Sequence, residues 1–587
     1  MELKSIFAIL SIIALVVTLY KGWLRASFAF LGTAFLFLIC QIITPEELLN
    51  GLSNKQIIVI FLLIGLTAGI QKNIGSGFFF KLFSQKLPPA QFRFRMMALV
   101  GGLSAFLNNT PVVAFMIPYV KDWARANGYP ASKFLIPLSY STILGGMVTV
   151  VGTSTNLVLN GLISKYDYPL LQFEDFFYLG MLVSLIGITY LTFASNFLLP
   201  KREENQDKII EHLNEYLVET LVSEHSTMIG KSVKDAGLRN LKEIFLAEIA
   251  RGDQEISPVS PKEVLQEGDR LFFTGNTKAI LSLIQEQNGL VLPEESHVSK
   301  LGLFQLTEAV VPSTSSLIGE RIKDSDFRNR YNASIISIHR KGVKLKGNIG
   351  ETKVQAGDLF LMLTGRNYER SEYLRDLIIV TLQGEIAPEK RSFKRLPSLI
   401  AICFLLAGIV GYVDLFLAAF AGIITLYSFN VLNLPTLRKT LDLDLLFILV
   451  SSLAIGVALK NSGAANLIAE GLRMLSSNES PVLALILLFV FTLVLTSLVT
   501  NAAAVSIMFP IALELGTQLG QPLTPFFVGI AFAASGDFMT PIGYQTNLMV
   551  MGPGNYKFGD YFKIGFPLTL IYAATVLCFI TWYYDFN

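Results

Sequence analysis

The sequence predicts a polytopic α-helical membrane protein, an inverted repeat of about 5+5 transmembrane helices with two re-entrant hairpins, plus two small cytoplasmic α+β domains inserted between the halves. Three observations lead to this prediction. The 587-residue chain is 52% hydrophobic and only 16% charged, its charges concentrate in residues 201–392, and one polar motif occurs twice among apolar segments. A soluble protein has about 25% charged residues, so the composition is that of a membrane protein with a polar insertion.

The apolar segments of each half are long enough to cross a bilayer, which takes about 20 residues. We expect five spans in each half: 4–20, 24–43, 56–72, 132–160 and 173–199, then 394–412, 414–432, 443–460, 522–551 and 563–584. The expected domains are a first transmembrane repeat (1–200), two inserted domains (201–302 and 303–392) and a second transmembrane repeat (393–587).

The repeated motif centres on Asn109 and Asn501. The first copy reads Asn109-Thr-Pro-Val-Val-Ala-Phe-Met-Ile-Pro118 and is followed by Gly152-Thr-Ser-Thr-Asn156. The second reads Asn501-Ala-Ala-Ala-Val-Ser-Ile-Met-Phe-Pro510 and is followed by Gly543-Tyr-Gln-Thr-Asn547. Further pairs keep nearly the same offset: Lys72 and Lys460, Ser104 and Thr496, Thr149 and Thr540. This ordered series indicates an internal duplication.

Each central Asn interrupts a long apolar stretch, 94–124 in the first half and 481–518 in the second. We expect each stretch to be a re-entrant helical hairpin, because irregular backbone at membrane depth is tolerated only inside protein or beside a watery cavity. Small polar residues can also serve close helix packing alone. Polar groups inside a membrane are expensive, however, and usually functional.

The Lys and Arg distribution predicts the orientation. Cationic residues gather in alternate loops, which the positive-inside rule places in the cytoplasm. We therefore expect an integral plasma (inner) membrane protein with both termini outside and residues 201–392 cytoplasmic. The second half would then be inverted relative to the first, with hairpin 94–124 opening inward and hairpin 481–518 opening outward.

Broken helices suit the binding of ions. Helix N-termini attract anions, whereas helix C-termini and unwound carbonyls suit Na⁺. An Asn side chain offers a carbonyl to a cation and an amide to an anion. Neither motif contains Arg or Lys, so an anion would be held by N–H groups, hydroxyls and neighbouring Na⁺ ions. The pattern predicts a secondary transporter with cation-dependent anion transport.

These residues resemble the divalent anion/sodium symporter family (sodium:sulfate/dicarboxylate symporters). The family's Ser-Asn-Thr tips correspond to Asn108-Asn109-Thr110 and Thr500-Asn501-Ala502, with the central Asn kept and the hydroxyls partly changed. The resemblance also implies an unwound segment in the helix that follows each tip, at Gly152-Thr-Ser-Thr-Asn156 and at Gly543-Tyr-Gln-Thr-Asn547. The resemblance implies about two Na⁺ sites as coupling sites and no organic cofactor. It also implies a homodimer in the lipid bilayer with elevator-type alternating access, and we favour sulfate as the substrate.

The resemblance also implies roles for individual residues. The implied substrate contacts are Asn108, Asn109, Thr110, Thr153, Thr500, Asn501, Tyr544 and Gln545. The implied Na⁺ ligands are Ser104, Asn109 and the Gly152 region at the first site, and Thr496, Asn501 and the Gly543 region at the second.

Asp537 is an isolated carboxylate within an expected span, six residues before Gly543. A carboxylate at membrane depth usually has a function or a partner. Two interpretations stay open: a structural hydrogen bond to unwound backbone, or a cation or proton ligand that contributes to coupling.

The charged insertion is itself a tandem repeat. Residues 216–291 and 303–380 share a Gly-Asp turn, at Gly268-Asp269 and at Gly357-Asp358. The two units resemble TrkA C-terminal (RCK_C) domains, which implies a small cytoplasmic regulatory ligand, although a dimerisation or spacer role is also open. The phosphate-loop pattern is absent from the sequence.

Two other transport functions stay open. One is a Na⁺-coupled dicarboxylate or tricarboxylate symporter of the same family. The other is a cation/proton antiporter or arsenite-type exporter of related fold, which would use Asp537 as its ion carboxylate. A K⁺ channel lacks its filter sequence Thr-Val-Gly-Tyr-Gly. The four His are scattered, so we expect no enzyme, and a net charge of +2 gives no indication of a nucleic-acid partner.

Overall fold

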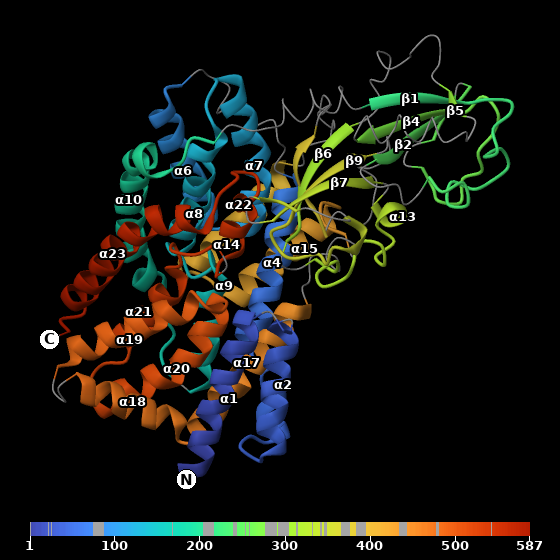
Figure 1. Ribbon diagram of the computed structural model, residues 1–587. Coiled ribbons are helices and arrows are strands. Elements are labelled where there is room, and N and C mark those ends of the chain that lie inside the picture. Colours follow the sequence, from blue (N-terminus) through green and yellow to red (C-terminus); the bar gives the residue numbers. More distant parts are fainter. Residues whose placement is uncertain are drawn as a thin grey trace. The chain divides into compact units, whose positions relative to one another are not determined.

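The computed structural model of the chain divides into two compact units (Figure 1). A helical unit comprises Met1–Pro200, Pro388–Val550 and Lys557–Asn587, and a β-rich unit comprises Lys201–Ala387 and Met551–Tyr556. The structure describes residues 2–21, 23–24, 26–73, 87–166, 168–202, 217–238, 244–252, 254–256, 259–275, 290–291, 305–312, 315–331, 333–340, 343–345, 349–364, 376–382, 395–433, 443–476, 480–541 and 543–586.

The first half of the helical unit follows the apolar runs of the sequence. Its helices are α1 (Glu2–Lys21), α2 (Ala26–Ile39), α3 (Pro45–Leu49), α4 (Lys55–Asn73), α6 (Pro89–Ser104), α7 (Asn109–Ala126), α8 (Leu135–Gly146), α9 (Ser154–Lys165) and α10 (Phe173–Leu198), with a 3₁₀ turn at Ala131–Lys133. The short α3 is started by a capping box, in which Thr44 and Glu47 satisfy each other's backbone N–H groups.

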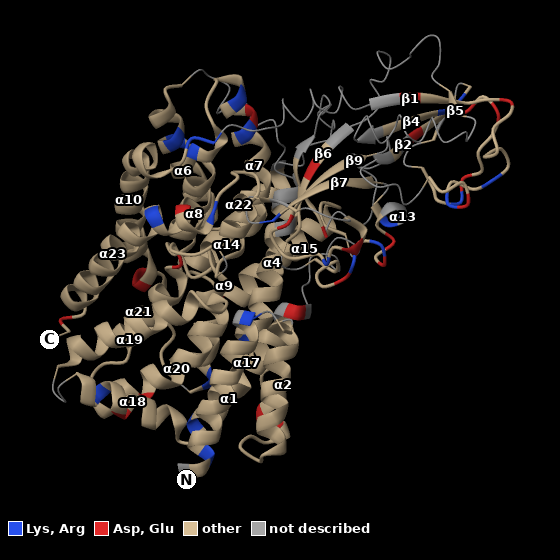
Figure 2. Cartoon of the chain, viewed as in Figure 1, with Lys and Arg blue, Asp and Glu red and all other residues tan. Residues whose placement is uncertain are grey.

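In the described residues the second half repeats most of this order, except that α3 has no counterpart between α15 and α17. Its helices are α14 (Arg395–Ile409), α15 (Leu415–Ser428), α17 (Leu443–Asn461), α18 (Ala464–Leu475), α19 (Pro481–Thr496), α20 (Asn501–Gln518), α21 (Thr524–Ser535), α22 (Gln545–Met551) and α23 (Phe558–Tyr583). The described helices carry few charges along their lengths (Figure 2), as expected of segments that face lipid or each other.

Two of the ten expected spans are broken at the unwound segments that the family resemblance implies. The expected span 132–160 is two helices, α8 and α9, and the expected span 522–551 is likewise divided into α21 and α22. Each break contains polar or glycine residues whose backbone groups are satisfied by side chains rather than by a helix. Hydropathy averaged over a long window passes across such breaks without registering them.

Few of the described helices meet a strict length test. By length and composition, two can cross a membrane, α10 and α23. A third span would be the pair Leu446–Asn461 and Ala464–Leu475, which bends by 70°. Seven other described apolar segments have between 10 and 17 residues. The expected spans 24–43, 394–412 and 414–432 are shorter than the sequence indicated, since α2, α14 and α15 have 14, 15 and 14 residues.

Glycines let the long helices lie directly against the two breaks. A Cβ added to Gly180 on α10 would stand 2.8 Å from the carbonyl oxygen of Met147, just after α8. A Cβ on Gly565 of α23 would stand 1.9 Å from the carbonyl oxygen of Phe538, just after α21. Only a residue without a side chain permits such backbone contact, so both halves fix their breaks in the same way.

The β-rich unit contains two five-stranded antiparallel sheets. The strands are β1 (Leu217–Val222), β2 (Ile244–Arg251), β3 (Gln254–Ile256), β4 (Arg270–Gly275) and β5 (Leu290–Val291), then β6 (Gln305–Val310), β7 (Ala333–Arg340), β8 (Val343–Lys344), β9 (Leu359–Thr364) and β10 (Ile378–Leu382). The first sheet has the order β3-β2-β4-β1-β5 and the second, read from its β8 edge, the order β8-β7-β9-β6-β10. Each strand of one sheet thus has a counterpart at the same place in the other.

Each sheet also contains the same irregularity and the same ion pair as the other. A register shift follows Leu246 in β2 and Ile335 in β7. Arg251 bonds both carboxylate oxygens of Asp269 at 2.8 and 2.9 Å, and Arg340 bonds both of Asp358 at 2.7 and 2.8 Å. The Gly-Asp turn that repeats in the sequence therefore supplies a buried anchor for an arginine in each domain.

Candidate functional site

The first Asn motif lies where one helix ends and another begins. Helix α6 ends at Ser104 and α7 begins at Asn109, which gives a helix, a break and a helix at the expected place. Ser104 donates a hydrogen bond from its hydroxyl to Asn109 Oδ1, and both side chains are buried. Asn108 is the N-cap of α7, because its Oδ1 accepts from the Thr110 N–H at 3.3 Å. The break is thus held by its own polar side chains.

The second Asn motif has the same construction. Helix α19 ends at Thr496 and α20 begins at Asn501. The Thr496 hydroxyl lies 3.0 Å from Asn501 Oδ1 and 2.6 Å from the carbonyl oxygen of Ala534. Thr500 is the N-cap of α20. Hydroxyl and amide therefore pair five residues apart in both halves.

The break between α8 and α9 is organised by Thr149. Its Oγ1 accepts from the Gly152 N–H at 3.1 Å and donates to the carbonyl oxygen of Ala105, in the first hairpin. Asn156 Nδ2 donates to the carbonyl oxygen of Thr149 at 3.1 Å. These bonds tie the unwound segment to the end of α6.

The break between α21 and α22 repeats two of these bonds. Thr540 Oγ1 accepts from the Gly543 N–H at 3.3 Å, and Asn547 Nδ2 donates to the Thr540 carbonyl oxygen at 3.1 Å. The third bond differs, because the Thr540 hydroxyl lies 3.3 Å from Asp537 Oδ1, whereas the Thr149 hydroxyl donates to the Ala105 carbonyl oxygen.

Hydrogen bonds join the polar segments of the two halves. Asn109 Nδ2 donates to the Tyr544 hydroxyl, and the Thr110 hydroxyl lies 3.4 Å from Gln545 Oε1. Thr153 also lies beside the Tyr544 hydroxyl. The structure thus brings five of the residues expected to bind substrate, from opposite halves of the sequence, to one place.

A second connection joins the halves through α8. The Ser139 hydroxyl lies 2.7 Å from Asn547 Oδ1 and 2.9 Å from the Thr546 hydroxyl, and the Tyr140 hydroxyl donates to the carbonyl oxygen of Phe538. Sequence reasoning missed Ser139 and Tyr140. The only signal was a polar side chain in an apolar run, which does not identify a partner.

The residues expected to bind cations are less exposed than several of the residues expected to bind substrate. The side chains expected at the cation sites are buried: Ser104, Asn109, Thr496 and Asn501. Several expected substrate contacts reach the surface of the unit, with Asn108 and Thr500 exposed and Thr110, Tyr544 and Gln545 half-buried. The arrangement offers an accessible polar face with a buried oxygen-rich layer behind it.

Asp537 lies in the buried layer. Its side chain is 1% exposed, and its Oδ1 lies 3.3 Å from the Thr540 hydroxyl. A Cβ added to Gly543 would stand 2.0 Å from its Oδ2. The carboxylate is therefore directed at the second unwound segment.

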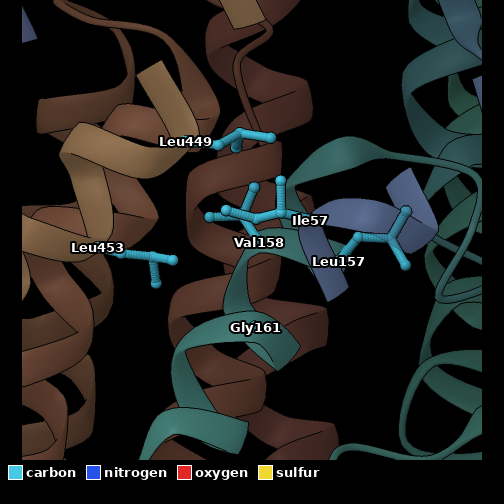
Figure 3. A pocket seen from close by; sticks show the side chains of 6 residues that line it. All are labelled: Ile57, Leu157, Val158, Gly161, Leu449 and Leu453. Atoms are coloured by element: carbon cyan, nitrogen blue, oxygen red, sulfur yellow. The ribbon is translucent and has the colours of Figure 1, made fainter. Parts of the chain in front are cut away.

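A small apolar pocket lies near these residues but is unsuited to ions (Figure 3). Its lining comes from α4, α9 and α17: Ile57, Leu157, Val158, Gly161, Leu449 and Leu453. Leu157 and Val158 directly follow Asn156 on α9, so the pocket borders the polar site without sharing its oxygens.

Comparison with known proteins places the whole chain among transporters. The model of a family described as citrate transporter matches residues 12–520 and, in a second match, residues 407–586. An uncharacterized transporter of Synechocystis is 31% identical over 566 residues, which cover 94% of this chain and 92% of that protein.

Two relatives from Chlamydomonas reinhardtii carry names that refer to sulfur. A protein named as a sulfur deprivation response regulator is 30% identical over 590 residues, covering 96% of this chain and 99% of the relative. The relative named sodium/sulfate cotransporter 2 is 23% identical over 756 residues, covering 92% of this chain and 85% of the relative.

Proposed function

Because the chain belongs to the citrate transporter family, whose members are membrane transporters and not enzymes, we propose that it is a secondary active symporter that couples uptake of a divalent anion, sulfate favoured, to Na⁺. The observation that supports this proposal most is the contact between the first Asn motif and the unwound segment of the second half. Asn109 and Thr110 of the first half bond Tyr544 and Gln545 of the second. A shared site built from broken helices of two repeats is the arrangement found in secondary transporters.

The exposed polar face is proposed to bind the anion. Asn108, Thr110, Thr500, Tyr544 and Gln545 supply neutral donors, and the helix N-termini of α7 and α20 add N–H groups. Neutral donors leave the two negative charges of the anion uncompensated, so cations in the adjacent layer are needed to balance them. This requirement is the physical basis for coupling to Na⁺.

The buried layer is proposed to bind the coupling ions. Ser104, Asn109 and the Gly152 segment would form one Na⁺ site, and Thr496, Asn501 and the Gly543 segment the other. Helix α6 ends at Ser104 and α19 ends at Thr496, so carbonyl oxygens with partial negative charge point into both places. Na⁺ favours such oxygens.

We further propose the transmembrane arrangement expected from the sequence. The helical unit would be an inverted repeat with re-entrant hairpins at α6–α7 and α19–α20, assembled as a homodimer in the plasma membrane with elevator-type movement. The matching helix order and the matching bonds of the two breaks support a duplication. Cysteine labelling of the expected loops from each side of the membrane tests the topology, and labelling of both termini from the inside would contradict it.

The β-rich unit is proposed to be a cytoplasmic regulator of the TrkA C-terminal type that responds to a small ligand. The identical strand order of the two sheets supports a tandem pair. A regulatory role predicts that a small-molecule fraction of the cytosol, enclosed in proteoliposomes, changes the uptake rate. An unchanged rate with every fraction would contradict the role.

Uptake into proteoliposomes tests the transport function. Radiolabelled sulfate, succinate and Rb⁺ are offered with and without an inward Na⁺ gradient. We expect Na⁺-driven accumulation of sulfate. The family description favours a second candidate, a di- or tricarboxylate, and Na⁺-driven succinate uptake without sulfate uptake would select it. Uptake of Rb⁺ alone would overturn anion symport.

A further inference from the structure

Asp537 occupies the place that Gly146 has in the first half. Gly146 precedes Gly152 by six residues, and Asp537 precedes Gly543 by six. A Cβ on Gly152 would stand 2.5 Å from the Gly146 carbonyl oxygen and 2.8 Å from that of Ser104. A Cβ on Gly543 would stand 2.0 Å from Asp537 Oδ2 and 2.7 Å from the carbonyl oxygen of Thr496. A carboxylate oxygen thus stands where the first half has a peptide oxygen.

Within the described part of the chain, this carboxylate oxygen has no hydrogen-bond partner. Asp537 is 1% exposed, and among the residues that the structure describes its Oδ2 has no hydrogen-bond donor. Within the same part of the chain, the buried amide Nδ2 of Asn501 is also unbonded. An unpaired buried charge is strongly unfavourable, so a cation at Oδ2 would satisfy the group that the fold leaves open.

One oxygen of the carboxylate has a structural contact in the break. Asp537 Oδ1 lies 3.3 Å from the Thr540 hydroxyl, and Thr540 also contributes a backbone hydrogen bond. The first half has glycine at the equivalent place, and there the Thr149 hydroxyl donates to the carbonyl oxygen of Ala105 instead. This structural contact accounts for Oδ1 but not for Oδ2, the oxygen that is directed at Gly543.

The two oxygen clusters therefore differ by one formal charge. The first contains the Ser104 and Gly146 carbonyl oxygens, and Asn109 Oδ1 stands 2.9 Å from where a Cβ of Gly146 would be. The second contains the Thr496 carbonyl oxygen, Asn501 Oδ1 and the Asp537 carboxylate. Hard cations bind carbonyl and carboxylate oxygens alike, and their affinity rises with the charge of the ligands.

We propose that Asp537 is a ligand of the second cation site, and that this site binds Na⁺ more tightly than the first and must be filled before the anion binds. The inference rests on the proposed Na⁺-coupled transport. The order follows from charge, since a divalent anion approaching Tyr544 and Gln545 would be repelled by an uncompensated carboxylate nearby in a medium of low dielectric constant. Na⁺ at Asp537 removes this repulsion.

Equilibrium binding of ²²Na⁺ to the purified full chain in nanodiscs, without any anion, tests the proposal. We expect two classes of site whose affinities differ by at least about tenfold. Asp537→Asn is expected to remove the tight class and keep the weak one. Asn109→Ala, the matched change at the first site, is expected to keep the tight class. A single class of equal sites in the unmodified protein would overturn the proposal without use of any variant.

A second variant and a second measurement distinguish loss of the Na⁺ site from misfolding of the variant. Asp537→Ser keeps a small polar side chain without charge and is expected to lose the tight class as well. Na⁺-dependent protection against thermal unfolding reports the same binding independently. Unchanged tight binding in either folded variant would overturn the role of Asp537.

Anion binding tests the order. Sulfate binding to the unmodified protein, measured calorimetrically, is expected to require Na⁺, and in Asp537→Asn to depend less steeply on Na⁺. An equal Na⁺ dependence in both proteins would contradict the order. If the protein binds no sulfate but Asp537→Asn still loses tight Na⁺ binding, the cation site stands and the anion assignment of the proposed function fails.

Discussion

The side-chain amide of Asn109 donates a hydrogen bond to the hydroxyl of Tyr544, although the two residues belong to opposite halves of the chain. The same Asn accepts from Ser104 through its Oδ1. One amide group therefore connects the end of α6, the start of α7 and the second unwound segment. If the first hairpin moves relative to that segment, the hydrogen bond between Asn109 and Tyr544 has to break. If the bond stays intact, the hairpin and the segment have to move together.

Replacement of Tyr544 by Phe removes the acceptor of the Asn109 amide and leaves the ring in place. A hydrogen bond of this kind contributes about 1 kcal/mol, so we expect about a fivefold weaker apparent affinity for the transported anion. Uptake by proteoliposomes over a range of anion concentrations measures it. Tyr572→Phe is the matched control, because its hydroxyl bonds the Phe532 carbonyl oxygen at 2.6 Å, away from the exposed polar face. Equal effects of the two changes would contradict the assigned role.

Asn109→Ala and Asn501→Ala are each expected to nearly abolish Na⁺-coupled transport. Each Asn begins a helix and pairs with a hydroxyl five residues earlier, so both the N-terminus and the cation oxygens lose their organising group. Protein amount in the membrane and size-exclusion profile control for insertion. Wild-type uptake by both variants would show that the breaks are structural.

The helix breaks at the Asn motifs could be predicted because Asn and Thr interrupt otherwise apolar runs there. The helices α7 and α20 begin at the two central Asn residues themselves. The division of 132–160 into α8 and α9 agrees with the unwound segment that the family resemblance implies, but no pattern in the residues themselves shows where α8 ends. Glycine and threonine are compatible with a helix in sequence terms, and only the tertiary acceptor at Ala105 makes the break favourable for Thr149.

Contacts between the halves could not be predicted, because they too depend on tertiary packing. The pairing of Ser139 with Asn547 depends on how α8 packs against the second break, and no periodicity in either segment encodes the partner. Helix α18, which follows α17 after a bend of 70°, lies outside the expected spans and hairpins. In the insertion, the repeated Gly-Asp turns predicted two similar domains but not their strand order.

Gly565→Ala tests the close approach of α23 to the second break. The added Cβ would stand 1.9 Å from the Phe538 carbonyl oxygen, so the helix or the break must move. Overpacking of this kind costs about 1–3 kcal/mol. We expect a lower thermal unfolding temperature together with reduced uptake.

Gly102→Ala is the control for this change, because nothing lies within 4 Å of the added Cβ. Alanine is also the better helix former at a position inside α6. Its unfolding temperature should equal or exceed that of the unmodified protein. A drop as large as that of Gly565→Ala would show that the loss reflects glycine removal in general.

Arg251→Ala should destabilise the first sheet. The Asp269 carboxylate, which is fully buried, holds the guanidinium through two hydrogen bonds, and this interaction raises the pKa of Arg251. Loss of the partner of a buried charge costs about 3–5 kcal/mol. Hydrogen exchange of β4 amides measures the effect, and Arg340→Ala should act equally on β9.

Arg321→Ala is the control for the arginine changes. Its ion pair with Glu351 is about half exposed on both sides, and pairs of this kind contribute about 0–1 kcal/mol. Amide exchange in β9 should change little. Equal destabilisation by Arg321→Ala and Arg340→Ala would contradict the distinction between the buried and the exposed pair.

Tyr331→Phe should produce a stability loss that depends on pH. The Tyr331 hydroxyl donates to Asp376 Oδ2 at 2.7 Å, and burial together with the Asp376 charge raises the pKa of Tyr331 above its ordinary value. The folded state thus holds this proton more tightly than the unfolded state. The stabilisation is complete below about pH 10, the ordinary tyrosine pKa, and is lost as pH rises toward the folded pKa.

We therefore expect Tyr331→Phe to lower the stability of the second sheet by about 1–2 kcal/mol at pH 7, and this difference from the unmodified protein to shrink above about pH 10. Hydrogen exchange of β10, corrected for the intrinsic rate at each pH, measures it. A difference that stays constant with pH would mean that Tyr331 does not keep its proton through the Asp376 contact.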